Sequence, residues 1–391
     1  MELTSPGPTL GVVGGGQLGR MLGEAAAPLG VDLIVLDPTP GCPAAPVARD
    51  QIVADFDDSE AIARLADRSD AITLEIELAN PDAMKQASAA TGIPVHPNPE
   101  TLRMIQDKLI QKERLAEAGI PVPEFRSVDD ADDLRAAIED LGPVMLKARE
   151  GGYDGRGNRP VQGLDEVESA IEVFGNNAMA EALLDFKREL SIIAVKGDDE
   201  TAMFPVTETI HREEILRETI TPARADSAVL AHARSVVEDV LAEMQGRGVY
   251  GVELFQDEDD QILVNEIAPR PHNSGHWTIE GATVSQFEQH VRAVLDLPLA
   301  NIRLRSKTAM ANLLGDVEQD QPAALQGVET LLSADGCHLH WYGKREARPL
   351  RKLGHLTVAA DGTDIDDSDA LLDRARELRD ATTFRSNPPV S

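Results

Sequence analysis

The chain has 391 residues, enough for two or three domains, and its composition of 42% hydrophobic and 27% charged residues is that of a globular protein. No apolar run reaches the roughly 18 residues of a membrane span, no signal-peptide pattern opens the sequence, and two cysteines supply neither a disulfide framework nor a zinc site. The formal net charge of −31 argues against nonspecific binding to nucleic acid or to an anionic membrane. We therefore expect a cytoplasmic enzyme.

Lysine is scarce, with nine residues against 28 arginines. An acidic excess with few lysines is typical of proteins that stay soluble in high salt, although an ordinary acidic protein from a GC-rich genome has the same composition. In either case an anionic substrate meets a repulsive field. An anion site must therefore be built from local groups of basic residues.

The first predicted unit is a β-α-β fold, in which residues 9–16 and 31–36 are apolar runs that flank a helical pattern. A GxGxxG spacing begins at Gly14, and Asp37 follows about 20 residues later, which matches the dinucleotide fingerprint. Alone, this motif is weak evidence for an oxidoreductase. Physically it predicts backbone amides at a helix N-terminus that face an anion such as a phosphate.

A further strand is predicted at residues 71–74, and Glu75 and Glu77 follow it. Carboxylates at the C-terminal end of a strand in an open α/β sheet lie on the ligand side. From the pattern alone, an acidic helix N-terminus explains the same two residues equally well.

The next stretch joins a helix to a glycine-rich loop. Residues 99–118 form a predicted helix in which Lys108 and Lys112 lie one turn apart, and a later strand ends at Lys147. The sequence GGYDGRGN follows at residues 151–158, with four glycines in seven residues that let the backbone fold closely over a ligand. No GK[ST] follows, so this is not a P-loop. We interpret it as a mobile loop over nucleotide phosphates, with a plain surface hairpin as the alternative.

Residues 176–181 and 190–195 are predicted to be paired strands. Their apolar connector carries a carboxylate at each end, Glu181 and Glu189. An adenine ring needs an apolar slot and a ribose needs an acceptor such as Glu189, although an ordinary exposed connection fits the pattern too. Beyond them, His211 is either a ligand contact or a satisfied loop residue.

Two apolar runs at residues 249–255 and 262–267 flank a polar turn at residues 257–260, which predicts a β-hairpin. Each run carries one glutamate among its apolar residues, Glu253 and Glu266. The hairpin therefore holds two carboxylates whose positions depend on the register.

A four-residue turn sets Glu253 opposite Val264 and makes Glu266 a diagonal neighbour on the same face, about 7–8 Å away. Two such carboxylates repel unless positive charge lies between them, and magnesium suits a site of one or two carboxylates plus phosphates. A solvated strand face is the alternative. A three- or five-residue turn would place the glutamates on opposite faces. The loop that follows, with Arg270 and His272, favours a functional site.

The C-terminal part contains a group of basic residues that we call the basic island: Lys344, Arg345, Arg348, Arg351 and Lys352. A run of charge is usually a solvated face. In a chain this acidic, however, such an island is what a phosphate or carboxylate pocket requires.

Taken together, these motifs resemble the N5-carboxyaminoimidazole ribonucleotide synthetase family, the ATP-grasp enzymes of purine biosynthesis. The resemblance runs from Gly11 to about Val358 and rests on the segments GVVGGGQLGRML, DKL…AGIPVPEF, KAREGGYDGRGN, GVELF, NEIAPRPHNSGHWTIEG and YGKREARPLRKLGH. It implies that ATP phosphorylates bicarbonate to carboxyphosphate, whose carboxyl group then passes to the exocyclic amine of aminoimidazole ribonucleotide. ATP and Mg²⁺ are the implied cofactors.

The resemblance also implies an α/β and α+β architecture, an ATP-grasp fold with a Rossmann-like N-terminal domain and a small β-rich C-terminal domain. The expected boundaries are 1–98, 99–303 with a mobile lid at about 120–187, and 304–391. A homodimer is expected. Within the same fold, a formate-dependent glycinamide ribonucleotide transformylase or a biotin carboxylase is the rival, and an NAD-dependent oxidoreductase is the rival from another class.

By the same resemblance, specific residues take roles in the site. ATP would contact Lys108, Lys147, Gly152, Tyr153, Asp154, Gly155, Arg156, Gly157, Asn158, Glu181, Ala182, Leu183, Leu184, Glu189, His211, Asn265 and Glu266, with magnesium on Glu253 and Glu266. Bicarbonate and the aminoimidazole would lie among Tyr153, Asp154, Arg156, Arg270, His272 and Asn273, with Asp154 handling the proton of the amine. The substrate phosphate and ribose would be bound by Gly15, Gly16, Gln17, Leu18, Glu75, Glu77, Lys344, Arg348 and Arg351, so that the N-terminal glycine turn binds substrate and not NAD.

Overall fold

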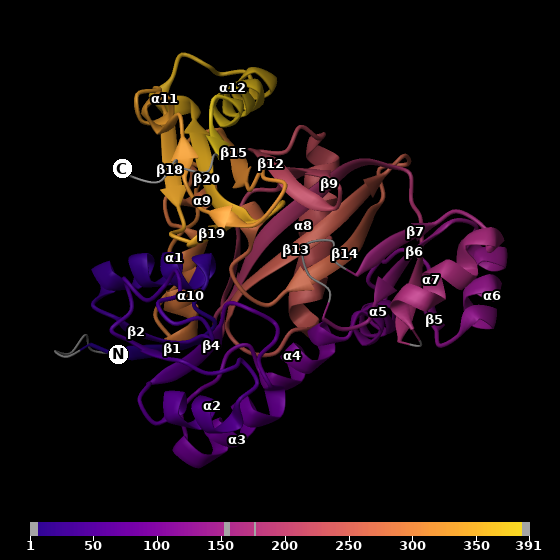
Figure 1. The fold of residues 1–391 in the computed structure, drawn as a ribbon, viewed down its shortest axis with the longest axis horizontal. Coiled ribbons are helices and arrows are strands. Elements are labelled where there is room, and N and C mark those ends of the chain that lie inside the picture. The colour runs from indigo at the N-terminus through magenta and orange to yellow at the C-terminus, as the bar shows by residue number, and fades with distance from the viewer. Residues whose placement is uncertain (1–6, 152–156, 176, 385–391) are drawn as a thin grey trace.

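The computed structural model describes residues 7–151, 157–175 and 177–384, and Figure 1 shows the path of the chain. The N-terminal part is a parallel sheet with strand order β3-β2-β1-β4. Its elements are β1 Thr9–Val13, α1 Gln17–Ala26, η1 Ala27–Leu29, β2 Asp32–Leu36, β3 Asp50–Ile52, α2 Ser59–Ala66, β4 Ala71–Leu74 and α3 Pro81–Thr91. The apolar strands are buried between α1 on one face and α2 with α3 on the other. The predicted β-α-β unit and the strand at 71–74 are confirmed.

The predicted helix over residues 99–118 is wrong in one respect, because the structure has two helices there. They are α4 Pro99–Gln106 and α5 Lys108–Glu117. Asp107 lies between them in an extended conformation, and its carboxylate accepts the backbone N–H groups of Leu109 at 3.0 Å and Ile110 at 3.3 Å. An aspartate that caps the N-terminus of a second helix ends the first one.

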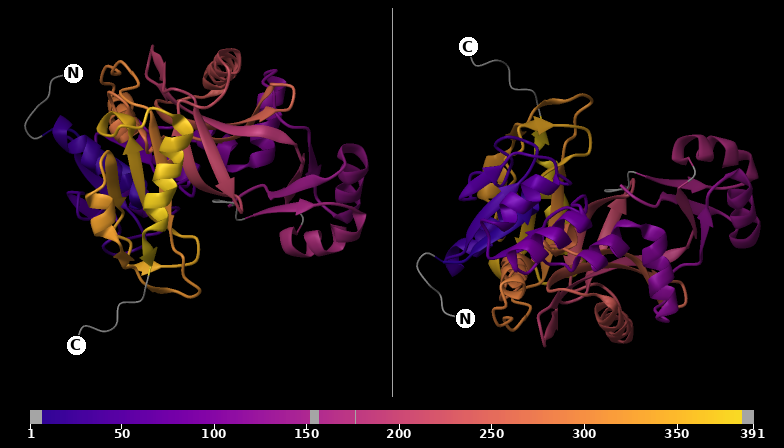
Figure 2. Two further views of the ribbon diagram at one scale, coloured as in Figure 1. Left: turned by 90° about the horizontal axis from the view of Figure 1, so that it is seen from above. Right: turned by 90° about the horizontal axis from the view of Figure 1, so that it is seen from below.

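A small antiparallel sheet with strand order β5-β8-β6-β7 follows. Its elements are β5 Phe125–Val128, α6 Ala131–Leu141, β6 Val144–Ala148, β7 Asn158–Val161, η2 Leu164–Glu166, α7 Val167–Phe174 and β8 Ala178–Ala182. It buries its own apolar cluster under α6 and α7. Figure 2 shows this unit standing to one side of the remaining molecule, both from above and from below.

The predicted pairing between residues 176–181 and 190–195 is wrong. Strand β8 pairs with β5 and β6 of the small sheet, whereas β9 (Phe186–Lys196) pairs with β13 and β11 of the central sheet. The two strands face different apolar clusters, so their closeness in sequence does not make them neighbours.

The central sheet has nine strands. Its order is β14-β13-β9-β11-β12-β15-β20-β18, with β10 paired to β9. The strands are β9 Phe186–Lys196, β10 Thr201–Met203, β11 Thr207–Arg212, β12 Ile215–Thr221, β13 Gly248–Asp257, β14 Ile262–Ala268, β15 Thr308–Leu314, β18 Cys337–Trp341 and β20 Lys352–Ala359. Helix α8 (Ser227–Glu243) covers one face of β9, β13 and β14. Helix α10 (Gln286–Val294) packs on β13 and β9 and also on α1, which joins this sheet to the N-terminal unit.

The C-terminal part continues this sheet. Strand β15 pairs with β12 on one side and with β20 on the other, so one sheet includes strands from both sides of the boundary expected between residues 303 and 304. Helix α12 (Ser368–Asp380) packs on β15 and β20. The short remaining elements are η3 Asn273–Gly275, α9 Thr278–Gly281, β16 Gln321–Pro322, β17 Leu325–Gln326, α11 Val328–Leu332, β19 Glu346–Ala347, η4 Ala360–Gly362 and β21 Thr383–Phe384.

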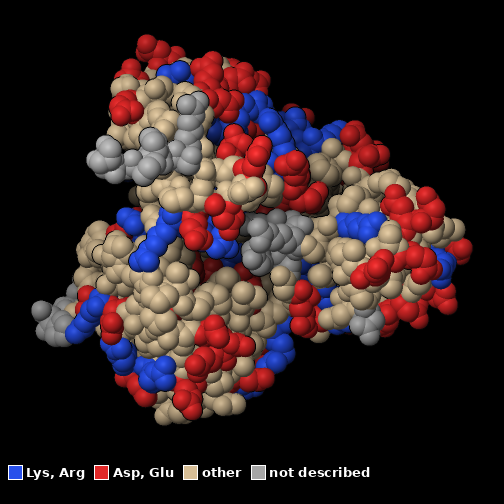
Figure 3. All heavy atoms as spheres, in the orientation of Figure 1, with Lys and Arg blue, Asp and Glu red and all other residues tan. Residues whose placement is uncertain are grey.

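The surface reflects the acidic composition. Figure 3 shows acidic side chains spread over the viewed face, with a dense group of basic side chains beside α12 and further basic side chains over the N-terminal unit. Among the described residues, no helix combines the length and apolar character that crossing a membrane requires.

Candidate active site

One cleft of about 1400 Å³ gathers residues from the N-terminal turn, the small sheet, the central hairpin and the basic island. The predicted residues that line it are Gly16, Gln17, Leu18, Glu75, Glu77, Lys108, Lys147, Asn158, Glu181, Ala182, Leu183, Leu184, Glu189, His211, Glu253, Asn265, Glu266, Arg270, His272, Asn273, Lys344, Arg348 and Arg351. Gly15 and Gly157 lie outside this lining. Gly152, Tyr153, Asp154, Gly155 and Arg156 fall outside the described residues, so their predicted roles are not placed.

The hairpin of β13 and β14 carries its two glutamates directly opposite each other. Gln256 pairs with Ile262, which leaves a five-residue turn, and that turn by itself would put Glu253 and Glu266 on opposite faces. A β-bulge between the turn and the glutamates restores the shared face, because Asn265 is an extra residue on β14. The predicted four-residue turn, and with it Glu253 opposite Val264, is wrong.

The bulge also explains why adjacent residues both reach the cleft. Asn265 Nδ2 donates to Glu253 Oε2 at 3.4 Å, and Asn265 Oδ1 accepts from Lys147 at 3.2 Å. Glu266 Oε1 lies 2.7 Å from Lys108 Nζ. In a regular strand, Asn265 and Glu266 would point to opposite faces.

The two glutamates differ in their electrostatic surroundings. Desolvation raises the pKa of Glu253, and repulsion from Glu266 and Glu189 adds to this rise. The cleft also desolvates Glu266, but Lys108, Lys147 and His272 together outweigh that cost and lower its pKa. A carboxylate pair of this kind is stabilised by a cation placed between its members. The arrangement therefore fits a hard divalent cation, which takes one or two carboxylates and completes its shell with water and phosphate oxygens.

A buried carboxylate lies at the small-sheet side of the cleft. Glu181 Oε1 is 2.5 Å from Lys147 Nζ, and Glu181 Oε2 is 2.7 Å from Lys112 Nζ. Burial alone would raise the pKa of Glu181, yet the two ammonium groups lower it to about 2. Burial also lowers the pKa of Lys112 to about 8. Lys147 is thus held at the edge of the cleft by Glu181 and Asn265.

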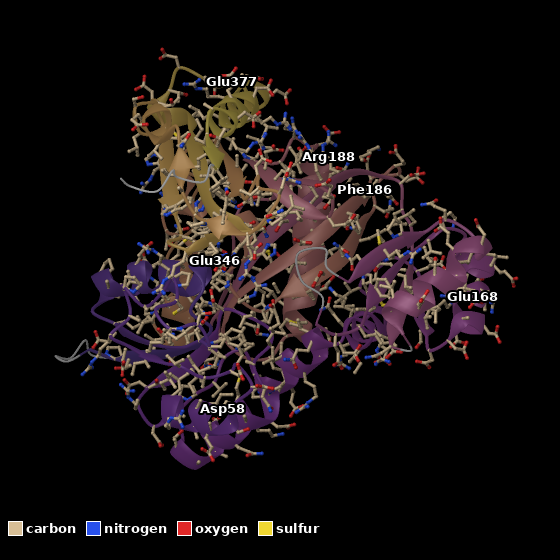
Figure 4. The ribbon with its side chains drawn as sticks, viewed as in Figure 1. Asp58, Glu168, Phe186, Arg188, Glu346 and Glu377 are labelled. Atoms are coloured by element: carbon tan, nitrogen blue, oxygen red, sulfur yellow. The ribbon has the colours of Figure 1, made fainter. Side chains whose placement is uncertain are left out.

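An apolar slot with a polar end lies beside these groups. Leu183 and Phe186 are 41% and 40% exposed, and the Phe186 ring stacks on Phe255 with 4.9 Å between centroids. Figure 4 shows Phe186 near Arg188 on β9, towards the outer end of the central sheet. At the other end, Glu189 Oε2 is 2.6 Å from His211 Nδ1. Desolvation opposes protonation of His211, but the Glu189 carboxylate raises its pKa.

The loop after β14 is fixed by amide side chains from distant elements. Gln286 accepts from His272 N at 2.9 Å and donates to His272 O at 2.7 Å. Asn273 and Asn312 exchange two amide hydrogen bonds of 3.0 and 2.7 Å. Arg270 Nε lies 2.8 Å from Glu77 Oε1, which links the loop to the N-terminal unit. The predicted residues of the loop are therefore held in one conformation at the floor of the cleft.

At the N-terminal turn, two carboxylates occupy amides that the sequence assigned to a substrate phosphate. Glu75 accepts from Gly16 N and, at 2.7 Å, from Gly19 N. Asp37 accepts from Gly15 N at 2.9 Å. In this structure the Gly15 and Gly16 amides are therefore engaged by carboxylates, and their use for a substrate phosphate stays a prediction. Asp37 is likewise engaged by the turn, because its second carboxylate oxygen accepts from Thr39 N at 2.8 Å.

The residues next along the turn face the basic island. Gln17 and Leu18 open α1 and line the cleft together with Lys344 and Arg351. Arg351 Nη1 donates to Glu346 O at 3.0 Å, and the Lys344 ammonium lies 5.9 Å from the centre of the Tyr342 ring. Burial raises the pKa of Glu75 to about 7 even though two amides favour its ionised form. Figure 4 places Glu346 where the C-terminal part meets the N-terminal unit.

Comparison with known proteins identifies the family of the chain that forms this cleft. Three family models match: the ribonucleotide synthetase preATP-grasp domain at residues 8–106, the ATP-grasp domain at 113–287 and the phosphoribosylaminoimidazole carboxylase C-terminal domain at 308–366. The N5-carboxyaminoimidazole ribonucleotide synthase of Brucella melitensis is 43% identical over 364 residues, which cover 91% of this chain and 98% of that protein. The chain belongs to the N5-carboxyaminoimidazole ribonucleotide synthase family.

Solved structures of this synthase family have the same fold. The synthetase from Thermotoga maritima superposes with a TM-score of 0.87 at 39% identity and covers 97% of this chain and 100% of that one. The synthase from Aspergillus clavatus, in complex with ADP and 5-aminoimidazole ribonucleotide, has a TM-score of 0.88 at 35% identity and covers 96% and 100%. The chain is accordingly an ATP-dependent enzyme of purine biosynthesis that binds ATP through an ATP-grasp domain and forms N5-carboxyaminoimidazole ribonucleotide.

Several residues of this synthase site carried no signal in the sequence. Lys112 was visible only as a lysine one turn from Lys108, and its burial depends on strands far away in the chain. Gln286 lies among other polar residues of α10, and Asn312 is a single amide in the apolar strand β15, and neither belongs to a motif. An amide among buried apolar residues is nevertheless a usable signal, because it must find hydrogen-bond partners.

Proposed function

We propose that the cleft binds ATP at the hairpin and small-sheet end and 5-aminoimidazole ribonucleotide at the end formed by the basic island. Bicarbonate would lie between them, near Arg270 and His272. The observation that carries this proposal is the cross-strand pair Glu253 and Glu266, which shares one cleft with Lys147 and with Lys344.

The chemistry explains why the site needs charge compensation. A bicarbonate oxygen attacks the γ-phosphorus of ATP, the bond from that phosphorus to ADP breaks, and carboxyphosphate forms. Carboxyphosphate then loses phosphate to give carbon dioxide. The exocyclic amine of the ribonucleotide attacks this carbon and loses a proton, which gives the N5-carbamate. Two anions meet in the first step, so positioning and neutralisation of charge supply most of the catalysis.

Five charged side chains in the described part of the cleft would take specific roles in this scheme. Lys108 and Lys147 would exchange their carboxylate partners for phosphate oxygens as ATP enters. Glu253 and Glu266 would hold magnesium, which when bound supplies positive charge at the phosphates. Arg270 would orient bicarbonate. Asp154, our proposed acceptor of the amine proton, lies outside the described residues.

The test is ADP release with ATP, magnesium and bicarbonate, measured with and without 5-aminoimidazole ribonucleotide. Strong stimulation by the ribonucleotide is the expected result. Because of the acidic composition, the assay is run in both low and molar salt. Absence of stimulation in both would contradict the proposed acceptor, and glycinamide ribonucleotide with formate would be tried next.

The proposal includes a homodimer, which rests on the family resemblance alone, and a cytoplasmic location, which rests on the composition of the sequence. Light scattering after size-exclusion chromatography tests the first, and fractionation of cells that produce the full chain tests the second. A monomeric mass, or recovery in a membrane fraction, would contradict the respective part.

A further inference from the structure

The carboxylate of Glu181 lies between two lysines that differ in access to the cleft. Lys147 lines the cleft, whereas Lys112 is absent from its lining among the described residues and is only 2% exposed. Each ammonium binds a different oxygen of the same carboxylate, at 2.5 and 2.7 Å. A ligand in the cleft can therefore draw Lys147 away from Glu181 but cannot reach Lys112.

We propose that Lys112 is a positioning residue for the reaction, which keeps Glu181 ionised and in place and thereby frees Lys147 to bind the phosphates of ATP. This inference rests on the proposed contact between Lys147 and ATP. No step of the chemistry passes through Lys112 itself.

The physical reason lies in the cost of a buried charge. An ionised carboxylate that loses its partner inside a protein is strongly destabilised, while a paired one is tolerated. With Lys112 present, Glu181 retains one ammonium when Lys147 turns towards a phosphate. Without Lys112, Glu181 has Lys147 as its one close ammonium, and it competes with ATP for that group.

Lys112 also ties together the elements that form the ATP end of the cleft. It lies on α5, its ammonium donates to Val264 O on β14 at 2.8 Å, and it binds Glu181 on β8. Val264 directly precedes the bulge residue Asn265, whose side chain binds Lys147. The same ammonium thus sets the position of the small sheet relative to the hairpin that carries Glu253 and Glu266.

The first test is Lys112→Met, assayed for the KM for ATP and for kcat with the other substrates saturating. We expect the KM for ATP to rise at least about tenfold while kcat changes less than about threefold. A tenfold loss of affinity is about what the loss of one charge-assisted contact to ATP costs. Lys112→Arg keeps the charge and should stay close to the wild type. An unchanged KM in Lys112→Met would overturn the proposal.

Lys196 provides the matched control. Its ammonium also caps backbone carbonyls, Leu241 O at 2.7 Å and Met244 O at 2.6 Å, but it has no place in the cleft lining. Lys196→Met should lower the thermal midpoint without raising the KM for ATP. If both variants raised that KM equally, loss of a buried carbonyl contact, and not competition for Lys147, would be the cause.

A double-mutant cycle with Glu181→Gln separates competition from packing. In a background without the carboxylate, Lys112→Met should raise the KM for ATP less than about twofold, because no buried carboxylate then competes with ATP for Lys147. The double variant buries no lone charge, so it remains testable even if Lys112→Met alone fails to fold. The inference would be overturned if Lys112→Met raised the KM for ATP about tenfold in both backgrounds. If Lys112→Met alone does not fold, a double variant whose KM for ATP is about ten times that of Glu181→Gln would overturn it.

Lys147→Met distinguishes failure of this inference from failure of the proposed function. If it leaves the KM for ATP unchanged, the proposed role of Lys147 is wrong and the role of Lys112 falls with it. If it raises that KM while Lys112→Met does not, the ATP site stands and the inference about Lys112 alone is wrong.

Discussion

Buried titratable groups are charged in the cleft but neutral where the N-terminal unit meets the central sheet. We call this second region, around His290, Thr73 and Val249, the joint. In the cleft, Glu181 is charged, because Lys112 and Lys147 outweigh its burial. In the joint, His290 is fully buried and neutral: its Nδ1 accepts from Val249 N at 3.0 Å, and its Nε2 lies 2.8 Å from Thr73 Oγ1. Charged groups can exchange partners with a ligand, whereas a neutral group whose partners are a buried backbone amide and a buried hydroxyl cannot. Changes in the cleft should therefore alter kinetics, and changes in the joint should alter stability.

The largest effect is expected for Glu266→Gln. Loss of one of two metal carboxylates should reduce magnesium-dependent turnover by about 10²–10³-fold or more, because charge stabilisation at the phosphates dominates this reaction. Steady-state ADP release measures it, with circular dichroism to confirm the fold. Glu258→Gln, at an exposed position in the turn of the same hairpin, is the control and should leave the turnover unchanged. Near-normal turnover would remove Glu266 from the metal site.

Lys344→Ala should act on the opposite end of the cleft. We expect the KM for 5-aminoimidazole ribonucleotide to rise about tenfold, since a hydrogen bond to a charged group is worth roughly 1.5–3 kcal/mol, and the KM for ATP to rise much less. Lys307→Ala is the control, because Lys307 is an exposed lysine that pairs with Asp366. Equal changes in both KM values, or none, would mean that the basic island is solvated surface.

The joint predicts a stability that depends on pH. Burial lowers the pKa of His290 to about 3, and burial with the nearby Arg247 lowers that of His96 to about 4. Both folded-state values lie below the unfolded value near 6.5, so the unfolded chain binds more protons and stability falls as the pH drops below about 6.5. Each group should cost roughly 2 kcal/mol by pH 5.

Urea unfolding between pH 7.5 and 5 measures this dependence. His290→Gln should flatten the slope, whereas the same change at the exposed His338 should leave it unaltered. A slope that stays the same in His290→Gln would place the titration elsewhere.

The smallest effect concerns the acidic surface. With a net charge of −31, screening should raise the thermal midpoint between 0.1 and 1 M salt. Loss of the fold below molar salt would support a protein adapted to high salt. A midpoint independent of salt would mean that the acidic charges are spaced widely enough not to matter.

Local pattern predicted the elements better than their partners. The β-α-β unit, the strand at 71–74 and the hairpin of β13 and β14 follow from apolar runs and turns, and the structure contains all three. The split at Asp107 was missed because a helical pattern continues across it. The false pairing of β8 with β9 arose because adjacent strands usually pair, and only the separate core of the small sheet overrides that tendency.

The same difference between local pattern and distant partners separates the site residues that were predicted from those that were missed. Motif residues such as Lys147, Glu253 and Glu266 were found from the sequence, and the cleft contains them. The bulge at Asn265 was not foreseeable, because one extra residue in a strand leaves no mark in composition. Lys112 was missed for another reason: its partners, Glu181 on β8 and Val264 on β14, come from two strands distant in the chain.

The continuous ladder from β12 to β15 has a consequence for any shortened form of this protein. A chain ending at residue 303 would retain the ATP-grasp segment yet leave β12 as an open edge, with unpaired N–H and C=O groups along Glu218–Thr221. It would also expose Ile220 and Ile210, which otherwise pack against the apolar side chains of the C-terminal part. Such an edge is a template for strand addition between molecules. The truncated protein should therefore form aggregates rather than an isolated domain.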